Sequence, residues 1–327
     1  MPRFVFLLAC LWVFAPALAG EPPSLSLPIA CTPGRDCWVV NYFDHDHSKE
    51  FQDYRCSWRG YDGHTGIDIS VGTLDRMNAG VSILAAADGT VIGGRDGEAD
   101  KGIARGEVLT VKECGNGLRI DHGGGWLTQY CHLKQGSVRF QPGMKVRRGD
   151  VLGLVGLSGM TEFPHLHIEV QYKDKKHPID PFTGFVASCK QAPRPLWDAA
   201  ALAKMPYRPV QIFSLGAADR IPERAALQQG VFEARRIAAS SEVFIVYFQA
   251  YGVPKGATLM MDIIAPDGTL FLRRTAVQER RQIQAYFYAG KKRGSAPWPR
   301  GTYRLIATVQ QDETGKKETQ EAEIKVY

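Results

Sequence analysis

Short apolar segments separated by glycine-containing turns run through the first half of the chain. Turn signals such as Asp88-Gly89 and Asn116-Gly117 interrupt these segments, and the text between them lacks the 3.6-residue spacing of a long amphipathic helix. Short runs of this kind are typical of β-strands. The pattern therefore predicts an all-β fold, with strands at 81–85, 89–92, 108–111 and 118–120.

Longer apolar segments characterise the second half of the chain. A hairpin turn is predicted at Pro266-Asp267-Gly268, between the second and third of them. Six or seven strands within roughly 120 residues are typical of a two-sheet sandwich, so we expect an immunoglobulin-like β-sandwich over residues 210–327. The predicted strands lie at 243–248, 259–264, 270–272, 283–288, 303–309 and 322–327.

A proline-rich segment separates the two halves. Four prolines lie between residues 190 and 209, around an alanine-rich patch at 198–203. This composition predicts a linker with at most a short helix. The first domain is then expected at residues 31–189, built from antiparallel β-sheet.

The first 19 residues have the composition of a secretory signal peptide. Arg3 precedes an apolar run, and Ala17-Leu18-Ala19 supplies a small-x-small cleavage site. An anchored N-terminal helix and a lipoprotein box ending at Cys10 are the alternatives, and the short apolar stretch before Cys10 favours cleavage after Ala19. No other segment approaches the roughly 20 apolar residues of a membrane helix. We expect an exported protein, periplasmic or extracellular, with no stable membrane insertion after cleavage.

The charge balance is mildly basic. The chain has 40 Lys and Arg against 34 Asp and Glu, a formal net charge of +6. This excess is too diffuse to predict a nucleic-acid partner, for which a clustered basic stripe is typical. It agrees with a protein that works on anionic polymers or surfaces. The sequence gives no indication of the oligomeric state.

Six cysteines remain after removal of the signal peptide. An even number in an oxidising compartment predicts disulfides, and the absence of a C-x-x-C pair argues against thiolate zinc or a redox centre. Cys114 and Cys131 flank a predicted hairpin and form one expected pair; the partners of the other four stay open. These four are Cys31, Cys37, Cys56 and Cys189.

Histidines supply the candidate chemistry of the first domain. They occur as His64-x-x-x-Asp68, as Tyr130-Cys131-His132, and as His165-Leu166-His167-Ile168-Glu169 on a predicted strand. Alternation places His165, His167 and Glu169 on one face of this strand and the apolar residues on the other. Two imidazoles on a polar strand face suit a metal ligand beside a catalytic partner. Glu169 is expected either to hydrogen-bond a ligand imidazole or to face solvent.

A hydrolytic zinc site keeps three protein ligands and an open position for water. A close His/Asp pair with one distant His builds such a set, and without an H-E-x-x-H glutamate the two remaining histidines would transfer protons. A second H-x-H, Asp44-His45-Asp46-His47, offers a rival metal site, although a polar loop along the groove is the favoured interpretation.

The combination of H-x-x-x-D, Y-x-H-L and H-L-H-x-E resembles the lysostaphin-type (LytM-like) zinc endopeptidases over residues 60–182. The resemblance implies one zinc ion per chain held by His64, Asp68 and His167. It further implies that His132 and His165 are the catalytic histidines, which activate water and stabilise the oxyanion. The chain departs from the family pattern at Ile168, where Phe is usual, and in the loop at 157–163.

The resemblance implies a secreted zinc endopeptidase that cuts the peptide part of peptidoglycan, with a LytM-like catalytic domain followed by the immunoglobulin-like sandwich. Two alternatives remain. One is a wall-binding regulator that activates another peptidoglycan hydrolase, and the other is a secreted protease acting on glycine-rich proteins. The sandwich is expected either to bind substrate or a partner, or to cover the groove.

Overall fold

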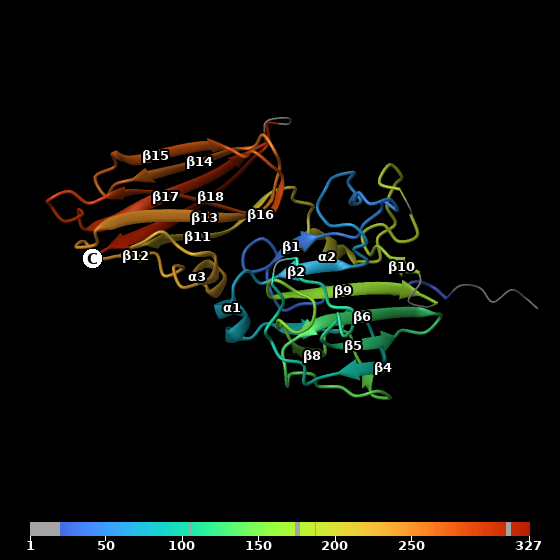
Figure 1. The fold of residues 1–327 in the computed structure, drawn as a ribbon. Coiled ribbons are helices and arrows are strands. Elements are labelled where there is room, and N and C mark those ends of the chain that lie inside the picture. Colours follow the sequence, from blue (N-terminus) through green and yellow to red (C-terminus); the bar gives the residue numbers. More distant parts are fainter. Residues whose placement is uncertain (1–19, 105, 174–176, 187, 312–314) are drawn as a thin grey trace, which may run out of the picture.

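The computed structural model describes residues 20–104, 106–173, 177–186, 188–311 and 315–327 (Figure 1). The predicted signal peptide, residues 1–19, lies outside the described residues. Strands make up 41% of the described residues and helices 6%. The predicted all-β class is therefore confirmed.

The first region is built on one eight-stranded antiparallel sheet. Seven of its strands follow the order β1-β2-β9-β6-β5-β4-β7, and β10 also pairs with β9. The separate pair β3 and β8 and the short helix α1 complete this region. The bounds are β1 (Trp38–Asn41), β2 (Ile67–Ser70), α1 (Leu74–Ala79), β3 (Ser82–Leu84), β4 (Gly89–Arg95), β5 (Asn116–Asp121), β6 (Trp126–Leu133), β7 (Lys145–Val146), β8 (Val151–Leu154), β9 (His165–Tyr172) and β10 (Pro178–Ile179).

Strand β9 shows why this sheet forms. Its residues Leu166, Ile168 and Val170 are buried in the main core of the first region, as their alternation predicts. The intervening positions are polar and lie on the opposite face of the sheet. One face of the sheet thus buries apolar area while the other presents histidines and a carboxylate.

The strand predicted at 108–111 is wrong. This segment lies in a long loop, and Val108 and Val111 are 73% and 70% exposed. Strand β4 pairs directly with β5, so the segment between them has no neighbour in the sheet. Three β-branched residues suggested a strand, but no neighbouring strand is available for this segment to pair with.

The second region is a sandwich of two sheets that enclose a second core. One sheet has the order β11-β13-β16, the other β12-β18-β17-β14-β15, and only β12 and β18 pair in parallel. The strand order of the two sheets favours an immunoglobulin-like sandwich, and this assignment stays a prediction. The bounds are β11 (Gln211–Ala218), β12 (Arg236–Ile237), β13 (Val243–Val253), β14 (Thr258–Ile264), β15 (Leu270–Val277), β16 (Gln282–Lys292), β17 (Gly301–Gln310) and β18 (Lys317–Val326).

Helix α3 (Arg224–Gln229) packs its Leu227 beside Tyr247 on the outer face of the three-stranded sheet. The sequence pattern did not predict this helix or β11. The hairpin turn at Pro266-Asp267-Gly268 is present, because Gly268 donates its backbone N–H to the carbonyl of Ala265.

The segment predicted as a linker packs against the first region. It contains the short helix α2 (Ala199–Lys204), whose first turn is capped when the Asp198 side chain accepts the backbone N–H of Ala201. Leu196, Trp197 and Met205 are buried in the first core. These apolar side chains hold the segment on the first region.

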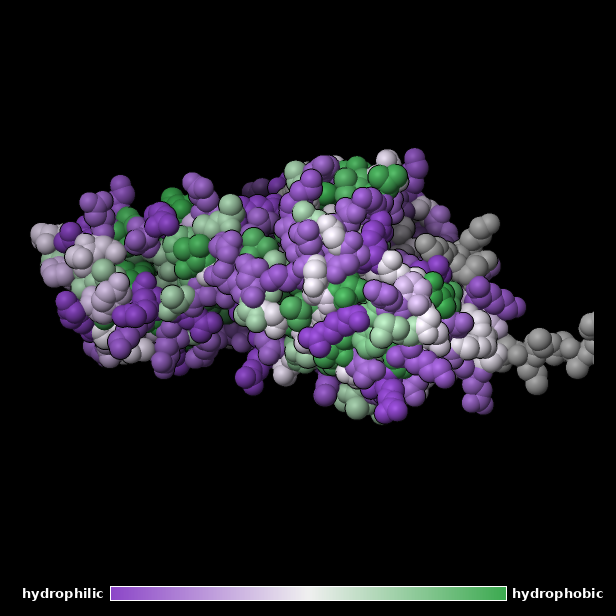
Figure 2. Space-filling view, turned by 90° about the horizontal axis from the view of Figure 1, so that it is seen from below, coloured by the Kyte–Doolittle hydropathy of each residue, from purple (hydrophilic) through white to green (hydrophobic). Residues whose placement is uncertain are grey.

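A small apolar cluster joins the two regions. Trp38 and Val40 of β1 pack with Phe213 and Tyr251 of the sandwich. The hydroxyl groups of Tyr251 and Ser70 lie 3.0 Å apart and form a hydrogen bond. The surface seen in Figure 2 has two lobes, with small apolar patches among hydrophilic residues. Within the residues that the structure describes, no helix has the length and apolar character needed to cross a membrane.

Candidate metal centre

Two of the predicted ligands come from β2 and the turn before it. Asp68 lies on β2, and the buried ring of His64 donates from Nδ1 to the carbonyl of Tyr42 at 2.7 Å. The Nε2 atom of His64 therefore keeps its lone pair for a ligand. Gly66 is required here, because a Cβ atom at this position would lie 2.7 Å from the ring of His167.

The donor atoms of His64, Asp68 and His167 converge into one group. Asp68 Oδ1 lies 3.1 Å from His64 Nε2 and 2.8 Å from His167 Nδ1, and the two nitrogens are 3.2 Å apart. Tetrahedral zinc with ligands at about 2.0–2.1 Å separates neighbouring ligand atoms by about 3.3–3.4 Å. The three donors thus fit one face of a zinc tetrahedron after a shift of a few tenths of an ångström.

The electrostatics of this group favour a cation. Burial acts to raise the pKa of Asp68, but the charges and hydrogen bonds of the neighbouring histidines outweigh it and hold that pKa well below its usual value. Burial acts to lower the pKa of His167, but Asp68 and Glu169 outweigh it and raise the pKa to about 9. Protons and a metal ion would therefore compete for these donors.

His132 and His165 lie beside the donor group. Their ring centroids are 4.7 Å apart, and His165 Nε2 lies 3.4 Å from Asp68 Oδ1. His132 donates from Nδ1 to the carbonyl of Ser158 at 2.8 Å, and the Nδ1 of His165 lies 2.9 Å from the carbonyl of Phe163. These bonds direct the proton to Nδ1 and leave both Nε2 atoms with lone pairs.

The backbone of His132 is in the left-handed region, with φ of 63°. A non-glycine residue with this conformation is strained, and such residues concentrate at functional sites. The segment is held by the disulfide between Cys114 and Cys131 and by the backbone N–H of His132, which donates to the carbonyl of Cys114. Burial and the two neighbouring histidines lower the pKa of His132 well below its usual value, so its ring is neutral at pH 7.

Two residues that the sequence did not single out border the centre. Asn41 donates from Nδ2 to Asp68 Oδ2 at 2.8 Å, and so fixes the carboxylate oxygen that lies outside the donor group. Tyr61 places its ring 4.5 Å from that of His64 and is 47% exposed. The short spacing of Tyr61 to His64 was a usable signal, whereas nothing in the sequence links Asn41 to Asp68.

Glu169 is buried, and its Oε2 lies 4.0 Å from His167 Nε2, the ring nitrogen remote from the donor group. The carboxylate also accepts hydrogen bonds from Thr65 and Gln171. The alternative that Glu169 simply faces solvent is therefore wrong, and it lies where it can orient His167.

The rival metal site at 44–47 does not assemble. His45 Nε2 lies 2.7 Å from a carboxylate oxygen of Asp180, and Asp44 accepts backbone N–H groups, including that of Gly63. Within the described part of the chain, one further group has metal-ligand spacing, Cys31, Asp36 and Cys37, and its two cysteines are joined in a disulfide. The polar-loop interpretation of 44–47 fits the observed contacts.

Comparison with known proteins points to one family. The sequence model of Peptidase family M23 matches residues 62–181. The chain is 36% identical over 110 residues to the cell division protein DipM of Caulobacter vibrioides, a match that covers 32% of this chain and 17% of DipM. It is 35% identical over 78 residues to the peptidoglycan DD-endopeptidase ShyB of Vibrio cholerae, covering 23% of this chain and 17% of ShyB.

Among solved structures, the catalytic domain of the prophage-encoded M23 protein EnpA from Enterococcus faecalis aligns with 20% identity and a TM-score of 0.30. This alignment covers 43% of this chain and 90% of that domain. The chain spans about a sixth of the length of the two curated relatives.

Proposed function

Because residues 62–181 form a domain of peptidase family M23, we propose that this protein is an exported zinc endopeptidase that hydrolyses peptide bonds in peptidoglycan. The observation that carries the proposal is the meeting of His64, Asp68 and His167 as one donor group with two further histidines beside it. The relatives named for peptidoglycan endopeptidase activity support the choice of substrate.

The donor set suits zinc. Two imidazole nitrogens and one carboxylate oxygen are usual zinc ligands in hydrolases, and the lone pair of His64 Nε2 is aimed into the group. When bound, zinc supplies a Lewis acid for the substrate carbonyl and for water. Asn41 and Glu169 hold Asp68 and His167 from outside the group.

The remaining histidines move the proton. One of His132 and His165 accepts a proton from the attacking water at Nε2, and the other, when protonated, donates to the oxyanion of the tetrahedral intermediate. The carbonyls of Ser158 and Phe163 keep both Nδ1 atoms protonated throughout. The leaving amine then takes up the proton that came from water.

A regulator without activity is the alternative from a different class. Loss of a ligand or of a catalytic histidine would favour it, and all five positions are filled and gathered in one place. A secreted protease acting on glycine-rich proteins would use the same chemistry, so only substrate profiling separates it from the main proposal.

Digestion of purified peptidoglycan tests the activity. Mass spectrometry of wild-type digests should show new amino termini at one type of peptide bond, and His64→Ala should yield none. The same products from both proteins would contradict the zinc mechanism. Cleavage of glycine-rich protein substrates with intact peptidoglycan would favour the secreted protease instead.

Metal analysis separates ligands from catalytic residues. His64→Ala should lose zinc, whereas His132→Ala should keep about one zinc per chain and lose about 10²–10⁴-fold in kcat/KM. His47→Ala, an exposed histidine in the polar loop, is the matched control and should change neither. Loss of zinc from His132→Ala would reassign that residue to the ligand set.

A further inference from the structure

The formal excess of positive charge, which the overall composition made appear diffuse, lies in one segment that connects the edge strands of the two sheets. Residues 270–293, here named the basic edge, contain seven basic residues and one acidic residue, Glu279. This segment alone accounts for the net charge of +6, because the remainder of the chain balances at 33 basic and 33 acidic residues. The seven basic residues are Arg273, Arg274, Arg280, Arg281, Lys291, Lys292 and Arg293.

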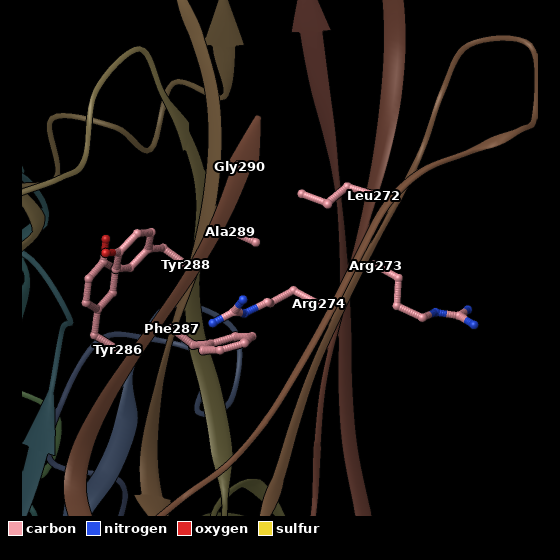
Figure 3. A pocket seen from close by; sticks show the side chains of 8 residues that line it. All are labelled: Leu272, Arg273, Arg274, Tyr286, Phe287, Tyr288, Ala289 and Gly290. Carbon is pink, nitrogen blue, oxygen red and sulfur yellow. The ribbon is translucent and has the colours of Figure 1, made fainter. Parts of the chain in front are cut away.

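The basic edge encloses a groove between the two sheets of the sandwich. Strand β15 pairs with β14 and β16 pairs with β13, so each ends its sheet and the two edges face each other. The groove has a volume of about 440 Å³. In Figure 3, Leu272 and Arg274 point from β15 toward Phe287 and Ala289 of β16, while Arg273 points away.

Most of these cations are not neutralised by carboxylates. Arg273 is paired with Asp262 at 2.7 Å, and Arg281 lies 3.9 Å from Glu50. Lys291 contacts the ring and the carbonyl of Phe271. Among the described residues, Arg274, Arg280 and Lys292 make no ion pair, and all three are exposed. The groove therefore combines an apolar floor with uncompensated positive charge.

One end of the basic edge contacts the first region. The guanidinium of Arg281 lies over the ring of Phe51 at 4.9 Å. Phe51 belongs to the loop that follows β1 and leads to Tyr61 and His64. A polymer lying along the basic edge would thus reach the loop that carries a predicted metal ligand.

We propose that the basic edge is a binding surface for peptidoglycan, in which the cations bind stem-peptide carboxylates and the groove takes small apolar side chains. The proposal rests on the peptidoglycan substrate proposed above. Charge on an edge strand also prevents edge-to-edge association. That role is served by either sign, whereas the unpaired charges here are positive except for Glu279.

Co-sedimentation with purified sacculi at 4 °C tests the surface without turnover. The variant Arg274→Glu/Lys291→Glu/Lys292→Glu keeps charged residues along the edge but leaves the segment with as many acidic as basic residues, and it should bind about tenfold more weakly. Lys255→Glu/Lys317→Glu/Lys325→Glu makes the same change in net charge at exposed positions elsewhere on the sandwich. This control should stay within about twofold of the wild type.

Circular dichroism confirms that both variants are folded. If both variants bind equally weakly, the loss of binding follows from overall charge, and the proposal is overturned. Binding of the first variant at the wild-type level would also overturn it.

Sacculi whose carboxylates have been amidated should bind the wild-type protein poorly. Undiminished binding to these sacculi would also overturn the proposal. Preferential capture by phosphatidylglycerol vesicles, with no sacculus binding, would assign the surface to lipid instead. Because no bond is cut, these results are independent of whether His64→Ala abolishes hydrolysis.

Discussion

Single residues outside the donor group fix the orientation of its side chains. The carbonyl of Tyr42 fixes the tautomer of His64, and Asn41 fixes the outer oxygen of Asp68. Both contacts come from β1 or the residue after it, which lies beside β2 in the sheet. The three candidate ligands are thus oriented by the fold itself, which would lower the cost of binding a metal ion.

The Asn41 contact gives a prediction at this scale. Asn41→Ala should weaken zinc binding about 10–100-fold, because the Asp68 carboxylate loses the donor that orients it. Competition with a chromophoric chelator measures the zinc affinity directly. Asn78→Ala, at an exposed position in α1, is the control and should bind zinc as the wild type does. An unchanged affinity for Asn41→Ala would mean that the sheet alone orients Asp68.

At the scale of elements, the end of β6 sets the position of His132, one of the two predicted catalytic histidines. His132 leaves the strand in the left-handed conformation, which turns its ring toward His165. The neighbouring disulfide and the loop carbonyl of Ser158 hold this arrangement. The loop that contains the wrongly predicted strand at 108–111 also contains Cys114. It therefore contributes to the site by holding His132, and not by pairing with another strand.

Removal of this disulfide should therefore affect stability and activity together. Cys114→Ser/Cys131→Ser opens a loop of 17 residues, and the free energy of unfolding should fall by about 3 kcal/mol. Cys31→Ser/Cys37→Ser opens a shorter loop of 6 residues and should cost about 2 kcal/mol without changing kcat. Urea denaturation and peptidase assays measure both effects. Unchanged kcat in the first variant would show that His132 is positioned without the disulfide.

At the scale of the whole molecule, one buried guanidinium adds hydrogen bonds to the apolar cluster that joins the two regions. Arg59 donates five hydrogen bonds to carbonyl oxygens, from β1 on one side and from the end of the predicted linker on the other. The hydrogen bonds of the five candidate site residues come from within residues 41–171 in the part of the chain that the structure describes.

Arg59→Met should loosen the junction. The substitution removes the Arg59 donors from the carbonyls of Val40, Arg208 and Pro209, and should lower the free energy of unfolding by about 2–5 kcal/mol. Limited proteolysis should cut faster within residues 190–210. Arg220→Met, at an exposed ion pair, is the control and should change stability by less than about 0.5 kcal/mol. Wild-type proteolysis rates in Arg59→Met would indicate that the apolar cluster alone fixes the two regions.

The sequence by itself determined the class of the fold, most strand positions and the candidate centre. Strands are visible because alternation is a local property, as in β9, where the apolar positions proved to be the buried ones. The five histidine and aspartate positions followed from a resemblance whose motifs are short and complete. Cys114 and Cys131 were paired correctly because they flank one hairpin.

Only the tertiary structure decided the contacts that join distant residues. Asn41 meets Asp68 across 27 residues, Cys56 meets Cys189 across 133, and Arg59 reaches Arg208 across 149. Contacts over such distances in sequence produce no periodic pattern along the chain, because the order of the strands in the sheet decides which residues meet. The same holds for the basic edge, whose groove exists because β15 and β16 end two different sheets on the same side.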